Sequence, residues 1–224
     1  MSDSVPLSDL AIAAYCPRKL HYVRQEDRSP PAVAERAREL SRSYPDLLTA
    51  SDAALTSKEL AVPPPAYRDA LARSRSRLDA WDAIVSPAET AVFVRGKAVH
   101  GRLDKVLAEP LAPVLVSPGT PPESGVWEPQ SVRAVGAAKA LSWREETPVE
   151  AAFVEYPLHG VVRRISVSTR RVADYRRTLR TVRALDGPPP RLHDAARCEP
   201  CEYAETCGVE TRSLRSMLPF SGDR

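Results

Sequence analysis

Four cysteines, at the two ends of the 224-residue chain, have the spacing of metal or cluster ligands. Cys198, Cys201 and Cys207 form a C-x2-C-x5-C motif near the C-terminus, and Cys16 is the one further cysteine. A C-x2-C turn presents two thiolates to one centre, and three thiolates leave a tetrahedral or cubane site one ligand short. With Cys16 as the fourth ligand the set is complete. The cysteines therefore predict that the N-terminal helix packs beside the C-terminal tail.

Two alternatives remain open for this centre. Spacing alone does not distinguish an iron–sulfur cluster from a four-cysteine zinc site. The other alternative is a buried free Cys16 together with a three-cysteine zinc site completed by His193.

The start of the chain has acidic residues and neither a basic region nor a long apolar run, so we expect no secretory signal and a cytoplasmic location. In a reducing cytosol, cysteines are more often metal ligands or catalysts than disulfides. No segment approaches the roughly 20 apolar residues of a membrane span, so no membrane partner is expected.

The composition is that of a folded domain with localised charge. Hydrophobic residues make up 43% of the chain and charged residues 27%, which is enough for a core and excludes wholesale disorder. A formal net charge of +3 does not by itself indicate a nucleic-acid binder. If the chain binds DNA, the weak net charge favours a localised groove over a uniformly basic surface.

Hydrophobic periodicity predicts helices first and mixed strands and helices afterwards. Helices are expected over 8–24, 29–44, 63–85, 128–143 and 169–187, and strands over 90–96, 98–107, 112–117, 148–157 and 161–168. This order predicts an α/β (α+β) fold with a mixed central sheet flanked by helices. We expect a single domain in three parts: an N-terminal helical part (1–88), a core (89–186) and a C-terminal cysteine cluster (187–224).

The N-terminal "CPRK" with its aromatic neighbours and the C-terminal C-x2-C-x5-C motif together resemble the RecB-like, CRISPR-associated exonucleases, the fourth Cas family. The related iron–sulfur nuclease domains of helicase-nucleases share this pattern. The resemblance covers nearly the whole chain. It implies a PD-(D/E)xK restriction-endonuclease-like core, a 4Fe-4S cluster on the four cysteines, and DNA exonuclease chemistry with Mg or Mn.

The catalytic motifs of that family are largely missing. The stretch "VHGRLDKV" resembles the family's G-x-x-D strand, which makes Asp104 the remnant catalytic and metal-binding residue. His100 lies on the same face of the strand and is a second candidate metal ligand. Val116 and Pro118 stand where the family's Glu and Lys are expected, and neither side chain can bind a metal. We therefore expect a degenerate and inactive nuclease centre.

In that case we expect Asp104 to pair with Arg102 or a neighbouring arginine, although a small polar site that includes Glu155 is also open. The helix that should carry the family's His has none, so Glu35 or Glu39 is the candidate replacement. The alternative is an active exonuclease with displaced ligands, in which Glu109 or Glu123 replaces the missing Glu and Mg or Mn is bound.

The resemblance also places a basic and aromatic set beside the cluster: Arg18, Lys19, Tyr22 and Arg24. Arginines bind phosphates and aromatic rings stack on unpaired bases, so this set predicts contact with single-stranded DNA or duplex ends. A second arginine set comprises Arg163, Arg164, Arg170, Arg171, Arg176 and Arg177.

The function expected from the sequence is DNA binding in CRISPR adaptation or DNA repair, with other proteins of those processes as partners. The alternatives are the active exonuclease, a protein-interaction module with a structural cluster and no DNA affinity, and a zinc protein of unrelated fold.

Overall fold

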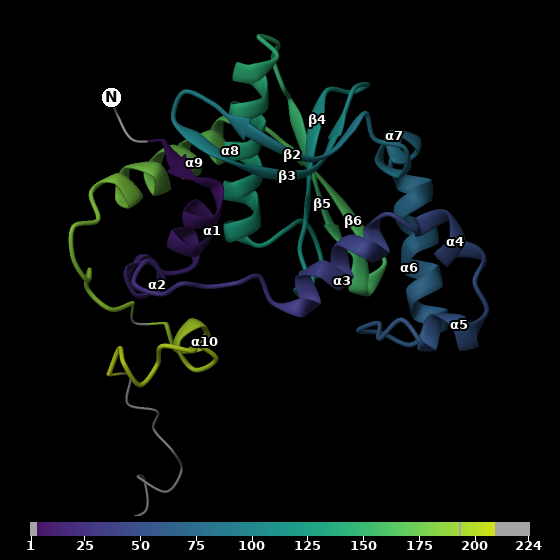
Figure 1. The fold of residues 1–224 in the computed structure, drawn as a ribbon, viewed down its shortest axis with the longest axis horizontal. Coiled ribbons are helices and arrows are strands. Elements are labelled where there is room, and N and C mark those ends of the chain that lie inside the picture. The colour runs from purple at the N-terminus through teal and green to yellow at the C-terminus, as the bar shows by residue number, and fades with distance from the viewer. Residues whose placement is uncertain (1–3, 193, 209–224) are drawn as a thin grey trace, which may run out of the picture.

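A mixed sheet forms the centre of the protein (Figure 1). The computed structural model describes residues 4–192 and 194–208. Its strands are β1 (Val5–Pro6), β2 (Glu89–Arg95), β3 (Val99–Leu107), β4 (Ala112–Val116), β5 (Ala151–Tyr156) and β6 (Val161–Ser166). Within the described residues the spatial order is β1-β3-β4-β5-β6, and β2 pairs with the other edge of β3.

The strand directions are mixed because the connections differ in length. β2 and β3 form an antiparallel hairpin, as do β5 and β6. β4 and β5 are parallel, with Val116 opposite Glu155, and the helix α8 (Glu128–Arg144) makes the crossover between them. The predicted mixed sheet flanked by helices is confirmed.

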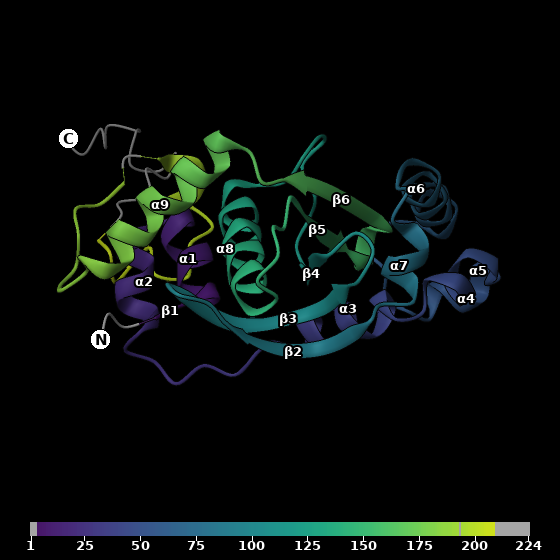
Figure 2. The same cartoon turned by 90° about the horizontal axis from the view of Figure 1, so that it is seen from above.

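Helices cover both faces of this sheet (Figure 2). One face carries α1 (Leu7–Tyr15), α8 and α9 (Thr169–Arg183), and the other carries α3 (Ala32–Ser41), α4 (Tyr44–Thr49), α6 (Pro64–Arg77) and α7 (Trp81–Val85). The shorter helices are α2 (Pro17–Val23), α5 (Asp52–Thr56), η1 (Pro157–His159) and α10 (Ala195–Cys198). Among the described residues no helix has both the length and the apolar character needed to cross a membrane.

The side chains of strand β5 are buried on both faces of the sheet. Its side chains alternate between the faces, and every one of its residues is buried. Val154 and Tyr156 pack in the core under α8, whereas Phe153 packs in the core under α6 and α7. The sheet therefore separates two hydrophobic cores.

The N-terminal helix α1 packs closely on α8 at Gly136. A Cβ atom at Gly136 would lie 2.9 Å from both Leu7 Cδ2 and Leu10 Cδ1. Leu7 and Leu10 are themselves buried in the core. Helix α1 is therefore fixed to the central sheet layer, and Cys16 follows directly after it.

The helix expected over 8–24 is two helices, and the break between them falls on Cys16. This residue is extended, with φ −160° and ψ 117°. Pro17 follows it, lacks an N–H, and disfavours the helical conformation of the preceding residue. The helix expected over 63–85 is likewise divided, between α6 and α7, where Leu78 is extended. The helix expected over 29–44 ends at Ser41, and α4 begins at Tyr44.

Candidate functional site

The N-terminal helices α1 and α2 and the described part of the C-terminal cysteine segment pack against each other, as the cysteines predicted. The Tyr15 hydroxyl donates a hydrogen bond to the Arg197 carbonyl at 2.6 Å, and the Arg197 guanidinium donates to the Tyr15 carbonyl at 2.9 Å. Burial raises the pKa of Tyr15, with the neighbouring Cys201 as the next cause, so the hydroxyl stays a donor. The α1–α2 junction is thereby joined to the segment that begins with α10 (Figure 1).

Helix α2 adds aromatic and ionic contacts to the same junction. The rings of Tyr22 and Tyr203 stack with centroids 5.4 Å apart. Lys19 Nζ lies 2.9 Å from a Glu202 carboxylate oxygen, and Arg18 Nη1 donates to the Pro189 carbonyl at 2.8 Å. These contacts hold the C-terminal segment over α2.

All four cysteines line one small cavity at this junction. Each thiol is free and each cysteine is partly exposed. In the part of the chain that the structure describes, no group of three or more Cys, His, Asp or Glu side chains is placed so that it could hold a metal ion. The fold thus gathers the predicted ligands around one space without drawing them into a finished coordination sphere. His193, the ligand of the alternative zinc site, lies outside the described residues.

The surroundings of the cavity suit a thiolate-ligated centre. Arg18, Lys19, Arg191 and Arg197 line it together with the four cysteines, and Tyr15 and Tyr22 supply aromatic walls. Four thiolates would carry negative charge, which these four cations would offset. The donor set fits an iron–sulfur cluster and a four-cysteine zinc ion alike.

The predicted DNA-binding set has internal partners. Arg18, Lys19 and Tyr22 make the contacts with the C-terminal segment described above. Arg24 donates two hydrogen bonds to one Asp9 carboxylate oxygen, at 2.8 and 2.9 Å. DNA contact by these four residues stays a prediction.

Asp104 lies where strands β3 and β4 separate. The two strands pair only through Lys105, Val106 and Leu107 on the β3 side. Beyond Lys105 the Asp104 side chain replaces the backbone pairing between the strands: its Oδ2 accepts a hydrogen bond from the Val116 amide at 2.8 Å. The Asp104 carboxylate therefore links β3 to β4 at the point where their backbones diverge.

The second oxygen of Asp104 is bound by an arginine, as expected, and the partner is Arg38 rather than Arg102. Arg38 Nε donates to Oδ1 at 3.0 Å, and Arg38 also pairs with Glu35 at 3.1 Å. On the α8 side, burial lowers the pKa of Arg133 while the nearby Asp104 opposes that change. Positive charge at Asp104 is thus supplied by guanidinium groups.

His100 does not reach Asp104. The two residues are four positions apart on one strand, about 13 Å along its axis. His100 Nδ1 is 3.0 Å from the Ser4 hydroxyl, and its ring packs against Phe93. The structure does not bring together the two metal ligands proposed from the sequence.

A buried ion pair beside Asp104 was not predicted from the sequence. Lys105 Nζ donates to Glu155 Oε1 at 2.8 Å, to the Ser41 carbonyl at 2.7 Å and to the Ile84 carbonyl at 3.1 Å. The two residues are 2% and 0% exposed. Burial raises the pKa of Glu155 to about 7, and Lys105 opposes that shift. The one available signal was Glu155, the single charged residue in the otherwise apolar strand β5, since β3 carries several charged residues.

No protein-family model matches the chain, and comparison with curated proteins finds no match. The proposed function therefore rests on the residues of this chain and on their geometry.

Proposed function

We propose that the protein is an iron–sulfur, DNA-binding protein with a PD-(D/E)xK-type core whose nuclease centre is degenerate. It would belong with the RecB-like, CRISPR-associated exonucleases and act in CRISPR adaptation or DNA repair, beside other proteins of those processes. The observation that carries the proposal is that Cys16 and the three C-terminal cysteines line one cavity, although they come from opposite ends of the chain.

The proposed cluster would have a structural role. When bound, it links α1 and α2 to the C-terminal segment through four thiolates. On the disulfide model, closing a loop of roughly 180 residues restricts the unfolded chain by about 5 kcal/mol. The hydrogen bonds between Tyr15 and Arg197 hold the same two segments in place beside the cysteines.

The contacts of Asp104 support a centre without cleavage activity. A nuclease metal site needs several oxygen ligands around the ion. Here one Asp104 oxygen is bound by the Val116 amide and the other by Arg38. Val116 is opposite Glu155 in the sheet and has no side-chain ligand to add. Glu155 itself is paired with Lys105.

The test uses anaerobically purified protein and labelled single-stranded and duplex DNA. We expect salt-sensitive binding of DNA, and no digestion with Mg²⁺ or Mn²⁺ present. Asp104→Ala should leave binding unchanged. Digestion that Asp104→Ala abolishes would contradict the proposed degenerate centre, and the absence of DNA binding at low salt would contradict the proposed DNA-binding function.

A further inference from the structure

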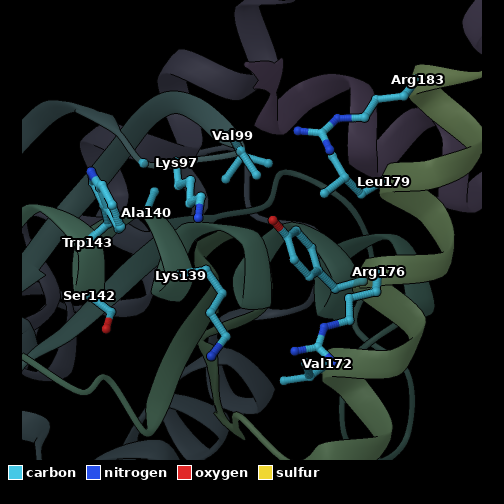
Figure 3. A pocket seen from close by; sticks show the side chains of 13 residues that line it. Lys97, Val99, Lys139, Ala140, Ser142, Trp143, Val172, Arg176, Leu179 and Arg183 are labelled. Atoms are coloured by element: carbon cyan, nitrogen blue, oxygen red, sulfur yellow. The ribbon is translucent and has the colours of Figure 1, made fainter. Parts of the chain in front are cut away.

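A second cavity lies at the other end of strand β3, between the β2–β3 turn, α8 and α9 (Figure 3). Its volume is about 540 Å³, within the range of ligand sites in proteins. It shares no lining residue with the cysteine cavity or with the small cavity at Asp104. We call it the basic cleft, after four of its lining residues: Lys97, Lys139, Arg176 and Arg183.

Positive charge in the basic cleft is not balanced by nearby acids. Its four cations are exposed, and no acidic residue lines the cleft. Figure 3 shows Lys97 and Arg183 along one side of the cleft and Lys139 and Arg176 along the other. Among the described residues none of the four forms an ion pair, whereas the neighbouring Arg177 pairs with Asp174 and Glu128. Such a cleft attracts an anion.

An exposed tryptophan completes the basic cleft. Trp143 is 58% exposed and follows Lys139 by one helical turn on α8, so the two side chains lie on the same face. Trp127, which is similarly exposed, donates its indole N–H to the Thr120 carbonyl at 2.8 Å and is thereby fixed to its own loop. Tyr175 also lines the cleft but is buried, so Trp143 is the exposed aromatic ring on which a planar ligand in the cleft could stack.

The turn between β2 and β3 packs directly against α8 at Gly96. A Cβ atom at Gly96 would lie 2.7 Å from the Cα atom of Ala140, closer than real Cβ atoms approach. Gly96 therefore lets the turn approach the helix and places Lys97 beside Lys139. The basic cleft depends on this close approach.

Two of the cations are spread along α9, which favours several phosphates over one. Arg176 and Arg183 are seven residues apart on α9, or about 10.5 Å along the helix axis. Arg180 lies between them and is exposed. A basic groove that also presents an aromatic ring, here Trp143 at the opposite end from the α9 arginines (Figure 3), is the arrangement that binds single-stranded nucleic acid without base readout.

We propose that the basic cleft binds the phosphate backbone of single-stranded nucleic acid and that a base stacks on Trp143. The inference rests on the proposed DNA-binding function and assigns the binding surface to the basic cleft. It also moves the principal contact away from Arg18, Lys19 and Tyr22, which contact the C-terminal segment, and from Arg24, which is paired with Asp9.

The test measures the affinity of the full-length holoprotein for a labelled single-stranded oligonucleotide as a function of salt. The first variant replaces all four cations of the basic cleft with glutamine. The matched control replaces four exposed cations of the opposite helical layer, Lys58, Arg73, Arg75 and Arg77, and so changes the net charge equally. The cleft variant should reduce the slope of log K against log salt by about 2.8 and the control should not.

A second pair of variants tests stacking. Trp143→Ala should weaken binding roughly tenfold, and Trp127→Ala should not. An oligonucleotide that contains 5-iododeoxyuridine should form a photo-crosslink to Trp143, identified by mass spectrometry of the joined peptide.

The outcomes separate this inference from the proposed function. If the wild type binds no single-stranded nucleic acid, both fail. If the wild type binds the oligonucleotide and both the cleft variant and Trp143→Ala keep its affinity and salt slope, the proposal for the basic cleft is overturned and the proposed DNA-binding function stands. A mononucleotide that binds the cleft and is not displaced by the oligonucleotide would overturn it as well.

Discussion

Replacing Asp104 tests whether this carboxylate joins two strands or serves a metal. Asp104 accepts a hydrogen bond from Arg38 at 3.0 Å and one from the Val116 amide at 2.8 Å, and Val116 is only 7% exposed. A hydrogen bond to a charged group contributes about 1.5–3 kcal/mol, and an amide left unpaired when buried adds a similar penalty. Asp104→Ala should therefore lower the free energy of unfolding by about 3 kcal/mol.

The isosteric change separates the two contacts. Asp104→Asn keeps an acceptor for the Val116 amide and removes the charge that pairs with Arg38, so it should lose about half as much, about 1.5 kcal/mol. For a chain of this size, about 3 kcal/mol corresponds to a fall in the unfolding midpoint of roughly 6–12 °C. The assay is thermal unfolding followed by circular dichroism under anaerobic conditions, and Asp79→Ala, at an exposed position, is the control.

Metal addition completes this experiment. Because both Asp104 oxygens have partners within the protein, Mg²⁺ and Mn²⁺ should leave the unfolding midpoint of the wild type unchanged. The reasoning is refuted if Asp104→Ala is as stable as the wild type. It is also refuted if Mn²⁺ stabilises the wild type and not the variant, since a ligand that binds the folded state raises its stability.

Three further changes follow from buried and junction contacts. Glu155→Leu should lower the free energy of unfolding by about 3–5 kcal/mol, because it leaves Lys105 charged and without its carboxylate partner. The double variant Lys105→Met with Glu155→Leu should regain most of that loss, as measured by denaturant unfolding. Equal stability of Glu155→Leu and the wild type would contradict this. Burial raises the pKa of Glu155 from 4.5 to about 7, so between these pH values the folded state holds a proton that the unfolded state has lost. The free energy of unfolding of the wild type should therefore fall as pH rises through this window. The same fall in Glu155→Gln would exclude Glu155 as its source. Tyr15→Phe should cost about 1 kcal/mol by removing the donor to the Arg197 carbonyl, and limited proteolysis should then cut the C-terminal segment faster; an unchanged cleavage rate would show that this bond does not hold the chain ends together.

Elements with one sustained period were predictable from the sequence. The β2–β3 hairpin, α8 and α9 follow the alternation or the helical repeat of their residues closely. The breaks at Cys16 and Leu78 were not predicted, because a helical apolar pattern continues across both positions. Strand β1 has two residues, too few to show a period, and it forms only because β3 offers a free edge there.

The candidate sites divide in the same way. The meeting of the chain ends follows from ligand counting, which needs no geometry. The arginine partner of Asp104 was expected, but the sequence does not identify Arg38, because that contact joins residues from opposite sides of the α3–β3 interface. The Lys105–Glu155 pair and the basic cleft require knowing which strands and helices are neighbours. Arg176 was named in an arginine set, whereas Lys97 and Lys139 gain significance only beside it.

The most direct test of the central claim is the metal content of anaerobically purified wild type and of Cys16→Ala. The account predicts about four irons and about four sulfides per chain in the wild type, and loss of the cluster in the variant. Zinc without iron in the wild type would contradict the iron–sulfur assignment. Full metal content in Cys16→Ala would contradict the shared centre that joins the two ends of the chain.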